Sequence, residues 1–570
     1  MRLRFARKRF IIPVAVGLTC AVMVTRPAAA EPDLVPPSPV VLVDKMTGNN
    51  AVTDTSKAWD VGATDLGVLW DDGAGHVLAA YGDTFSTPLD GGAGVGNWRS
   101  NVLLRSSDRD LADGMSFDWA LTGADGKASE IVGSKKEPGV EHTTIPTAGI
   151  EVNGRQYLAY MSVRQWGAPG QWWTNFAQLA YSDDLGATWT TDGAPRWDNT
   201  PTSDDGFQMM AFVKRDGFVY MFGTPNGRFG AASVARVDEA ALLDKNAYRY
   251  WDGAAWQTHR SAAKPVMDAA VAELTVRFDA ETRLWQAIYL NAHADLVFRV
   301  ATSPTGPWGS EQLLASQAEY PGLYGGFIHP WSTSNEIYYA QSTWNQYNVA
   351  LMRFSVDTTG TIVRPNLLAD PSFERSGEFG VPGGWQLEGS GGIDTNQAWA
   401  KMGRRQVWLR STSGEHRVVQ PVTIEPGTRY RLAGWVRTGD TVGGGAGVGY
   451  IGVSGVGPGA AQLARAAFTE HPTWRRVSVE FDSHALQQIE VVLGSKVTAD
   501  RWVQGDDFSL VAISEGSEPT PSPKPTSSSA GPSPSMSVGP RVTTEPTITM
   551  TASVTASRAE PGPGLPGTGG

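Results

Sequence analysis

The chain has 570 residues, a formal net charge of −11 and only one cysteine, Cys20. Because Cys20 lies in an N-terminal leader, the mature chain is expected to have no disulfide, thiolate nucleophile or cysteine metal site. The excess of acidic residues disfavours nucleic acids and anionic membrane surfaces as partners. A chain of this length without disulfides must depend on a large hydrophobic core, and it has room for more than one domain.

Residues 1–30 have the pattern of a secretory signal peptide. A positively charged segment that contains Arg2 and Arg9 precedes an uncharged run over residues 10–25, and alanines at 28–30 supply the small residues that a signal peptidase requires. The uncharged run is shorter than the ~20 apolar residues that span a bilayer, so a transmembrane anchor is less favoured. We expect cleavage after Ala30, a secreted extracellular protein and no insertion into the membrane.

Residues 40–363 contain many short apolar runs separated by Gly, Asp and Asn turns, with little helical periodicity. This pattern predicts an all-β domain, which could be a sandwich, a barrel or a propeller. Ser182 to Trp189 matches the Asp-box, Ser-x-Asp-x-Gly-x-Thr-Trp, a hairpin found between the outer blade strands of sialidase-like propellers. Its Asp is expected to cap the turn and its Gly to adopt a positive φ. A propeller is therefore favoured, and about 320 residues suit five blades better than seven.

Residues 364–514 are expected to form a second all-β domain. Its opening, Asn366 to Glu374, and its closing segment, Asp506 to Leu510, resemble those of carbohydrate-binding modules of the β-jelly-roll type. Trp385 and Trp399, in glycine-rich loops, are candidates for stacking on sugars. Such folds often contain structural calcium, but no loop here has a dense pattern of carboxylate ligands. We therefore expect no metal site and no required cofactor, and we leave structural calcium as an open alternative.

Residues 515–570 are dominated by Pro, Ser, Thr and Gly, and they contain almost nothing that could form a core. This composition predicts a disordered stalk. The final residues, Leu565 to Gly569, read Leu-Pro-Gly-Thr-Gly and resemble a sortase sorting signal, but the hydrophobic stretch and basic tail that normally follow are missing from this sequence. Attachment to the cell wall through the tail and a chance match in a Pro/Gly-rich segment remain alternatives.

The sharpest candidate for chemistry is a pair of aspartates on one expected hairpin. With its turn at residues 71–75, opposed strand positions have numbers that add to about 148, which Asp65 and Asp83 satisfy. Like charges that face each other destabilise a sheet, so the pair suggests a function. Two nearby carboxylates with different pKa values supply the acid and the base or nucleophile of glycoside hydrolysis. Capping of turns by both aspartates explains the pattern alone equally well.

Motifs around these aspartates resemble those of one actinobacterial family. Over residues 45–355 the chain is similar to glycoside hydrolase family 183, which was formerly classed as a domain of unknown function. Members of this family are endo-D-arabinanases, which cut the D-arabinan of mycobacterial arabinogalactan and lipoarabinomannan. The resemblance implies a five-bladed β-propeller with catalytic residues Asp65 and Asp83. By analogy with other five-bladed glycosidases, we expect Asp65 to be the base and Asp83 the acid. The matching motifs are Thr64 to Gly67, Gly82 to Phe85, Trp98 to Asn101, Thr144 to Thr147 and Tyr324 to Pro330.

Further candidate residues are loop aromatics and polar side chains close to these motifs. Aromatic rings beside glycines could stack on furanose rings, although a chain with 21 tryptophans uses many of them for packing. Polar side chains could bond sugar hydroxyls or tune the acid, whereas His329, before Pro330, is equally well explained as a structural histidine. The expected substrate-binding residues are Trp98, Asn101, Glu141, His142, Trp172, Asn226, Arg228, Tyr324 and His329.

Three functions are consistent with these observations. The favoured one is a secreted endo-acting hydrolase of α-D-arabinofuranosyl linkages, with a polysaccharide, D-arabinan, as its partner. A sialidase shares the Asp-box, but it needs an arginine triad and a tyrosine nucleophile supported by a glutamate, which the scattered arginines here do not suggest. A non-catalytic adhesin or lectin that binds cell-wall glycans would make both aspartates dispensable.

Overall fold

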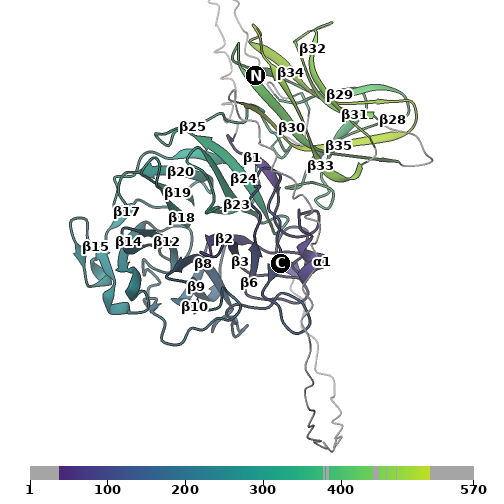
Figure 1. The fold of residues 1–570 in the computed structure, drawn as a ribbon. Helices are drawn as coiled ribbons and strands as arrows, with labels where there is room; N and C mark the ends of the chain where they lie inside the picture. The colour runs from purple at the N-terminus through teal and green to yellow at the C-terminus, as the bar shows by residue number, and fades with distance from the viewer. Residues whose placement is uncertain are drawn as a thin grey trace, which may run out of the picture. The chain divides into compact units, whose positions relative to one another are not determined.

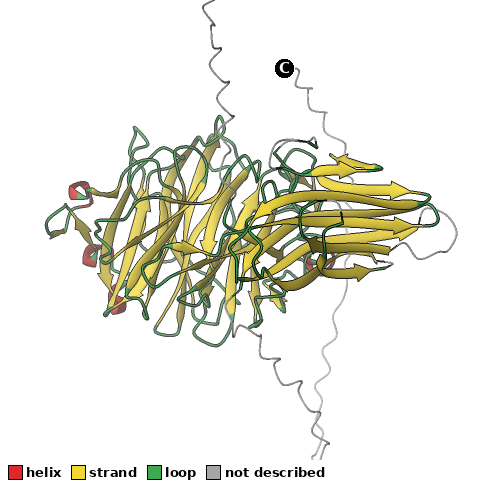
Figure 2. Ribbon diagram, turned by 90° about the horizontal axis from the view of Figure 1, so that it is seen from above, coloured by secondary structure: helices red, strands yellow, loops and turns green. Residues whose placement is uncertain are grey.

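A computed structural model describes residues 38–375, 379–380, 384–440, 448–457, 459–469 and 471–513. They are almost entirely β-structure, with one short α-helix, α1 (Thr55–Trp59), and three 3-10 turns (Figures 1 and 2). None of the helices in these ranges is long and apolar enough to cross a membrane. The expected signal peptide and the expected stalk with its Leu-Pro-Gly-Thr-Gly end lie outside the described residues.

Residues 41–363 form five antiparallel sheets, which follow one another along the chain. Sheet one has strands β2 (Leu66–Asp71), β3 (Val77–Tyr81), β6 (Val102–Ser106) and β7 (Trp119–Ala120). Sheet two has β8 (Thr143–Val152), β9 (Arg155–Trp166), β10 (Trp172–Ser182) and β11 (Arg196–Asp198). Sheet three has β12 (Met209–Arg215), β13 (Phe218–Thr224), β14 (Ala232–Asp238), β15 (Arg249–Trp251), β16 (Trp256–Gln257) and β17 (Pro265–Met267).

The last two sheets complete the series. Sheet four has strands β18 (Ala272–Asp279), β19 (Leu284–Leu290), β20 (Leu296–Ala301) and β21 (Gln312–Ala315). Sheet five has β22 (Leu323–Ile328), β23 (Glu336–Thr343), β24 (Asn348–Val356), β25 (Ile362–Val363) and, from the start of the domain, β1 (Val41–Lys45). A separate small ribbon is formed by β4 (Thr87–Pro88) and β5 (Gly94–Val95).

The first strands of the five sheets contact one another in a closed ring. Strand β8 contacts β2 and β12, strand β18 contacts β12 and β22, and β22 contacts β2. The later strands of each sheet lie further from the ring (Figure 1). This arrangement of radial sheets is a β-propeller, as the sequence predicts. Sheet five joins the two ends of the domain because β1 pairs with β24.

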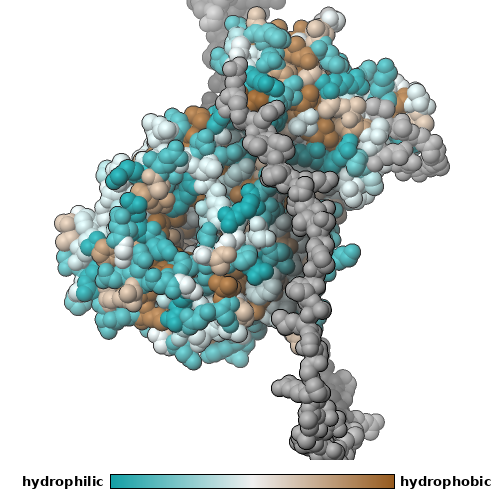
Figure 3. Space-filling view, in the orientation of Figure 1, coloured by the Kyte–Doolittle hydropathy of each residue, from teal (hydrophilic) through white to brown (hydrophobic). Residues whose placement is uncertain are grey.

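Apolar side chains pack between neighbouring sheets, and the outer surface is mostly polar. Leu179 of sheet two, for example, shares a buried cluster with Val219 and Met221 of sheet three. The face of the molecule seen in Figure 3 is mainly hydrophilic, with small hydrophobic patches. Inner and middle strands such as β3, β13, β19 and β22 are buried along almost their whole length, on both faces of their sheets, which explains the short apolar runs in the sequence.

The Asp-box forms the turn between β10 and β11. Asp184 accepts hydrogen bonds from the Thr188 amide at 2.8 Å and from the Ser182 hydroxyl at 2.8 Å. Gly186 has a φ of +91°, and the indole of Trp189 donates to its carbonyl at 3.0 Å. The turn thus has the capping aspartate and the positive-φ glycine that the motif predicts.

Residues 386–512 form two further antiparallel sheets of five strands each. One has β26 (Gln386–Glu388), β29 (Gly414–Thr423), β34 (Gln488–Val497), β31 (Val448–Ser454) and β32 (Gln462–Phe468). The other has β27 (Gly391–Asp394), β28 (Gln406–Ser411), β35 (Arg501–Ala512), β30 (Arg429–Asp440) and β33 (His471–Asp482). Apolar side chains from both sheets form one core. Trp385 is 4% exposed and packs against Phe373 and Phe508 in this core, so its expected role in sugar stacking is wrong.

Candidate active site

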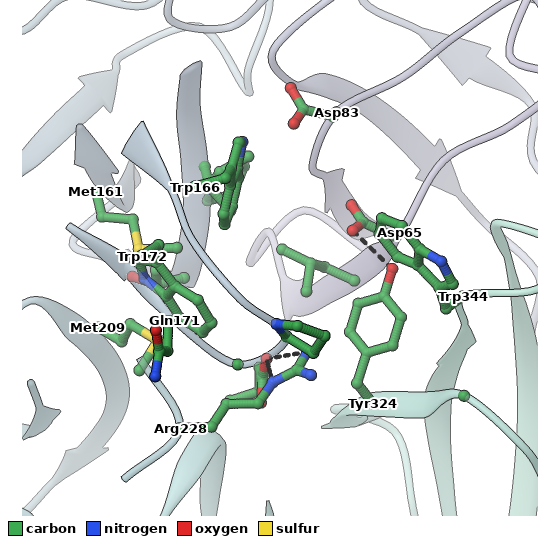
Figure 4. A pocket seen from close by; sticks show the side chains of 18 of the residues that line it. Asp65, Asp83, Met161, Trp166, Gln171, Trp172, Met209, Arg228, Tyr324 and Trp344 are labelled. Carbon is green, nitrogen blue, oxygen red and sulfur yellow. Dashed lines mark hydrogen bonds and ion pairs between the residues drawn. The ribbon is translucent and has the colours of Figure 1, made fainter. Parts of the chain in front are cut away.

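A cavity of about 980 Å³ is bounded by residues from all five propeller sheets and their connecting loops. Asp65 and Asp83 both line it, and Figure 4 shows their carboxylates on one side, with Trp166 and Trp172 on the other. Arg228 and Tyr324 lie below them in this view. The cavity therefore combines two acidic groups with aromatic surfaces, which suits a ligand with both hydroxyl groups and apolar faces.

The two aspartates lie at the same end of the β2–β3 hairpin. Leu69 pairs with Ala79, which is the register expected from the turn position. The register shifts by one residue at a bulge beside Leu66, and it returns at the bridge between Ala63 and Phe85. The bulge lies between the β2–β3 ladder and the Ala63–Phe85 bridge, so regular pairing is interrupted where the aspartates occur. This interruption allows both carboxyl groups to point into the cavity.

The Asp65 carboxyl lies in a tight and poorly solvated place. Its Oδ2 accepts a hydrogen bond from the Tyr324 hydroxyl at 2.8 Å (Figure 4), while Oδ1 is buried and has no hydrogen-bond partner among the described groups. A Cβ atom at position 82 would lie 2.3 Å from this Oδ1, so only glycine fits there. Burial, with a smaller contribution from the charge of Asp83, raises the pKa of Asp65 to about 7.

The Asp83 carboxyl has two hydrogen-bond donors. Its Oδ1 accepts from the Trp98 indole at 2.8 Å and from the Thr143 hydroxyl at 2.6 Å. Burial raises the pKa of Asp83 to about 6, and the two donors oppose this rise because they stabilise the anion. Its Oδ2 is not used by either donor.

These environments favour a protonated Asp65 beside an ionised Asp83 near neutral pH. Trp98 and Thr143 donate to the Asp83 anion. Tyr324 donates to Asp65, the Tyr347 hydroxyl also lowers the pKa of Asp65, and the Asp65 Oδ1 is buried without a close donor among the described groups. The expectation from the sequence has Asp65 as the base and Asp83 as the acid, and which of the two is the acid stays a prediction. Both carboxylates accept from side chains, and among the described hydrogen bonds neither accepts from a backbone amide, so the alternative of turn capping is not supported.

The structure brings five of the expected substrate-binding residues to the cavity with the aspartates. Trp98, His142, Trp172, Arg228 and Tyr324 all line it. Trp98 and His142 are also in edge-to-face contact, with ring centroids 5.5 Å apart. Burial lowers the pKa of His142, which keeps the imidazole neutral at neutral pH.

Four expected residues do not line the cavity, because their side chains support the loops instead. Asn101 is buried and bonds to Thr144 and Ile131, and Glu141 accepts from the Ser162 hydroxyl. The motif pattern shows that these side chains are polar, but it does not show which way they point.

The other two of these four residues are Asn226 and His329. Asn226 bonds to the carbonyl of Trp172 and to Asn199. His329 is fully buried after the far end of β22, where burial lowers its pKa to about 3. It is thus the neutral structural histidine that we weighed as an alternative.

Several cavity residues were not anticipated. Trp344 and Tyr347, in the β23–β24 connection, and Glu273, at the start of β18, line the cavity, and Trp344 is 48% exposed. The occurrence of two aromatic residues in one short turn of the sequence could have indicated that Trp344 and Tyr347 belong to the site. No local sequence signal distinguishes Glu273. In the described part of the chain, no group of three or more His, Cys, Asp or Glu side chains could hold a metal ion.

The fold and the cavity define a β-propeller with a buried pair of acidic groups at one end of its inner strands. Residues 50–353 match a family described as Domain of unknown function (DUF4185). This match covers more than half of the chain, and the chain therefore belongs to this family.

Two fungal proteins are similar to part of the chain. Notoamide biosynthesis cluster protein J of Aspergillus sp. (strain MF297-2) is 33% identical over 312 residues, which are 51% of this chain and 82% of that protein. Notoamide biosynthesis cluster protein J' of Aspergillus versicolor is 32% identical over 346 residues, which are 57% of this chain and 91% of that protein.

Some solved structures show weaker similarity. The exo-β-1,3-galactanase of Phanerochaete chrysosporium with galactose has a TM-score of 0.39 at 12% identity, covering 83% of this chain and 99% of that chain. A family 43 arabinoxylan arabinofuranohydrolase of Bacillus subtilis has a TM-score of 0.35 at 12% identity, with the same two coverages of 83% and 99%. TmCBM61 in complex with β-1,4-galactotriose has a TM-score of 0.22 at 19% identity, covering 26% of this chain and 99% of that chain. At these TM-scores we base no functional conclusion on the similarity.

Proposed function

We propose that the protein is a secreted endo-acting glycoside hydrolase that cleaves α-D-arabinofuranosyl linkages in the D-arabinan of arabinogalactan and lipoarabinomannan. The observation that carries hydrolysis is the Asp65–Asp83 pair, in which two carboxyls of one cavity have different hydrogen-bond partners and raised pKa values. The motif resemblance to glycoside hydrolase family 183 supports the arabinan substrate. In this proposal each of the five sheets is one blade, and the protein acts outside the cell, either free or attached to the wall through its tail.

In the proposed mechanism Asp65 is the general acid. Its carboxyl gives a proton to the glycosidic oxygen as the bond to the anomeric carbon breaks, and the Tyr324 hydroxyl stabilises the carboxylate that forms. Asp83 uses its Oδ2, which the two donors leave available, because they bond Oδ1. This oxygen either takes a proton from a water that attacks the anomeric carbon, or it attacks that carbon itself before water hydrolyses the intermediate.

The walls of the cavity suit a neutral sugar chain. Trp98, Trp166, Trp172 and Trp344 line it, and the exposed rings of Trp166 and Trp344 offer faces on which the C–H faces of sugar rings can stack. Arg228 is the only Lys or Arg among the described residues that line the cavity. This arrangement does not offer the arginine triad of a sialidase, so we do not favour that alternative.

We propose that residues 364–514 are a jelly-roll module that binds glycan. Val407 and Val503 point into the core of this region, so Trp408 and Trp502, which follow or precede them on β28 and β35, point to the opposite face of the sheet. Arg437 on β30 lies 4.7 Å from the ring centroid of Trp474 and 5.9 Å from that of Trp502. The exposed Trp399 accepts from Arg437 through its carbonyl. Trp399, Trp408 and Trp502 are therefore the candidates for stacking on sugars, whereas Trp474 packs partly against the hydrophobic cluster that contains Trp435.

Incubation with purified arabinogalactan and lipoarabinomannan, followed by chromatography of the products, tests the proposal. We expect arabino-oligosaccharides from the wild-type protein and none above background from Asp65→Asn or Asp83→Asn. Binding without any product from the wild-type protein would support the adhesin or lectin instead. Product formation by both variants at the wild-type rate would show that the pair is not catalytic.

A further inference from the structure

A third carboxylate, Glu273, lines the cavity with Asp65 and Asp83. Its side chain is only 8% exposed. One oxygen, Oε1, accepts from Arg228 Nε at 2.9 Å and lies 2.8 Å from Arg228 Nη2. The other oxygen, Oε2, is buried and has no hydrogen-bond partner among the described groups. A buried acceptor of this kind is costly for the fold, and it therefore calls for a partner that the protein itself does not provide.

The backbone at this position is also unusual. Glu273 has a φ of +42°, which is the left-handed region that residues other than glycine rarely adopt. The pairing of β18 with β19 is irregular between Ala272 and Thr275, so Glu273 lies in a bulge. Bulges and strained residues cluster at functional sites because they direct a side chain where regular pairing would not.

The partner of Glu273 connects this carboxylate to the acid. The Arg228 guanidinium lies 5.1 Å from the ring centroid of Tyr324 and 5.9 Å from that of Trp172. Tyr324 in turn donates its hydroxyl to Asp65 (Figure 4). The Glu273–Arg228 pair is therefore beside the position that the scissile bond would occupy, between two aromatic rings.

We propose that Glu273 and Arg228 form a sugar-binding subsite next to Asp65, in which Glu273 Oε2 accepts a hydrogen bond from a sugar hydroxyl and Arg228 donates to a sugar oxygen. This inference rests on the proposed hydrolase function. Because Glu273 already neutralises the one Lys or Arg side chain among the described lining residues, the subsite selects a neutral, hydroxyl-bearing sugar over a uronic or sialic acid.

The first test compares Glu273→Gln with a matched control. In Glu273→Gln, an amide nitrogen that donates can replace the accepting Oε2, whereas Glu281→Gln makes the same change at an exposed position in the turn between β18 and β19. We expect KM for short arabino-oligosaccharides to rise about 10- to 100-fold in Glu273→Gln, since the hydrogen bond has a charged acceptor, and to stay unchanged in Glu281→Gln. Thermal unfolding of both variants shows whether the fold is kept.

The second test needs only the wild-type protein and a set of mono-deoxy arabino-oligosaccharides. One analogue lacks the hydroxyl from which Glu273 accepts a hydrogen bond. On this analogue the kcat/KM of the wild-type protein should fall by about the same factor as the kcat/KM of Glu273→Gln falls on the full substrate. For Glu273→Gln, kcat/KM should be the same on this analogue as on the full substrate. A merely structural role for Glu273 would instead reduce the activity on every analogue by one common factor.

The outcomes separate the two proposals. If the wild-type protein cleaves no arabinan, the proposed function fails. If it does cleave arabinan, the subsite is refuted by a folded Glu273→Gln variant with wild-type KM and kcat. It is equally refuted if no mono-deoxy analogue loses more than about twofold with the wild-type protein. Wild-type binding of a uronic-acid oligosaccharide as tight as that of the neutral one would overturn the selectivity.

Discussion

The assignment of Asp65 as acid and Asp83 as base predicts a narrow pH optimum that one threonine controls. Activity needs Asp83 ionised and Asp65 protonated, so with pKa values of about 6 and about 7 the optimum lies near pH 6.5. At pH 4.5 or pH 8.5, kcat/KM should be about 20-fold below the optimum, because only about 3% of the molecules then have the limiting group in its active form. Thr143→Val removes one of the two donors to Asp83. The acidic limb should then shift upward by about one pH unit, since the anion loses a hydrogen bond.

The assay is kcat/KM against pH on a soluble arabino-oligosaccharide. Thr275→Val is the control, because its hydroxyl bonds to the Ile328 amide and to neither aspartate. A shift of the alkaline limb in Thr143→Val would show that Asp83 is the acid, which is the order we expected from the sequence. An unchanged profile in an active, folded variant would show that Asp83 does not set the acidic limb.

Four further predictions follow from particular contacts. Gly82→Ala should lower kcat by about 100-fold or more with the fold kept, because the added Cβ atom would lie 2.3 Å from Asp65 Oδ1. Gly206→Ala is the control and should leave kcat unchanged, because no atom lies within 4 Å of a Cβ added there. Equal kcat values in the two variants would contradict this prediction. Asp65→Asn should be rescued by an aryl arabinofuranoside with a good leaving group and Asp83→Asn should not, as rates on that substrate will show. The raised pKa of Asp65 means that the folded state loses stability as pH rises from about 4 to about 7. At pH 8 the calorimetric melting temperature of Asp65→Asn should therefore be about 4–8 °C above that of wild type, because the rise in the pKa of Asp65 to about 7 corresponds to about 4 kcal/mol. At pH 3.5 the two proteins should melt at the same temperature, and a variant that melts below wild type at pH 8 would refute the sign. Trp399→Ala should weaken binding to insoluble cell walls in a pull-down assay and leave kcat on short oligosaccharides unchanged. If both the binding and kcat fell, a separate binding surface would be refuted.

Local sequence determined the all-β character and the hairpin with the aspartate pair. Strand alternation and turn residues act over a few positions, so they can be recognised without knowledge of the rest of the chain. The register expected for the β2–β3 hairpin is found at Leu69 and Ala79, and the Asp-box turn has the expected cap at Asp184. Asp65 and Asp83 reach one cavity because they belong to one such hairpin.

The sequence motifs anticipated several cavity residues, among them Trp98 and Tyr324, but only the tertiary structure shows which side chains bond each carboxyl. The donors to the pair are Trp98, Thr143 and Tyr324, which come from separate parts of the ring and are up to 259 residues from the aspartate they bond. Glu273 and Trp344 reach the cavity in the same way, whereas Asn101 and His329, which lie in the recognised motifs, face other neighbours. Sequence spacing cannot report such contacts, because closure of the ring brings together sheets that are distant in the chain, and the pKa of a buried carboxyl depends on what those sheets place around it.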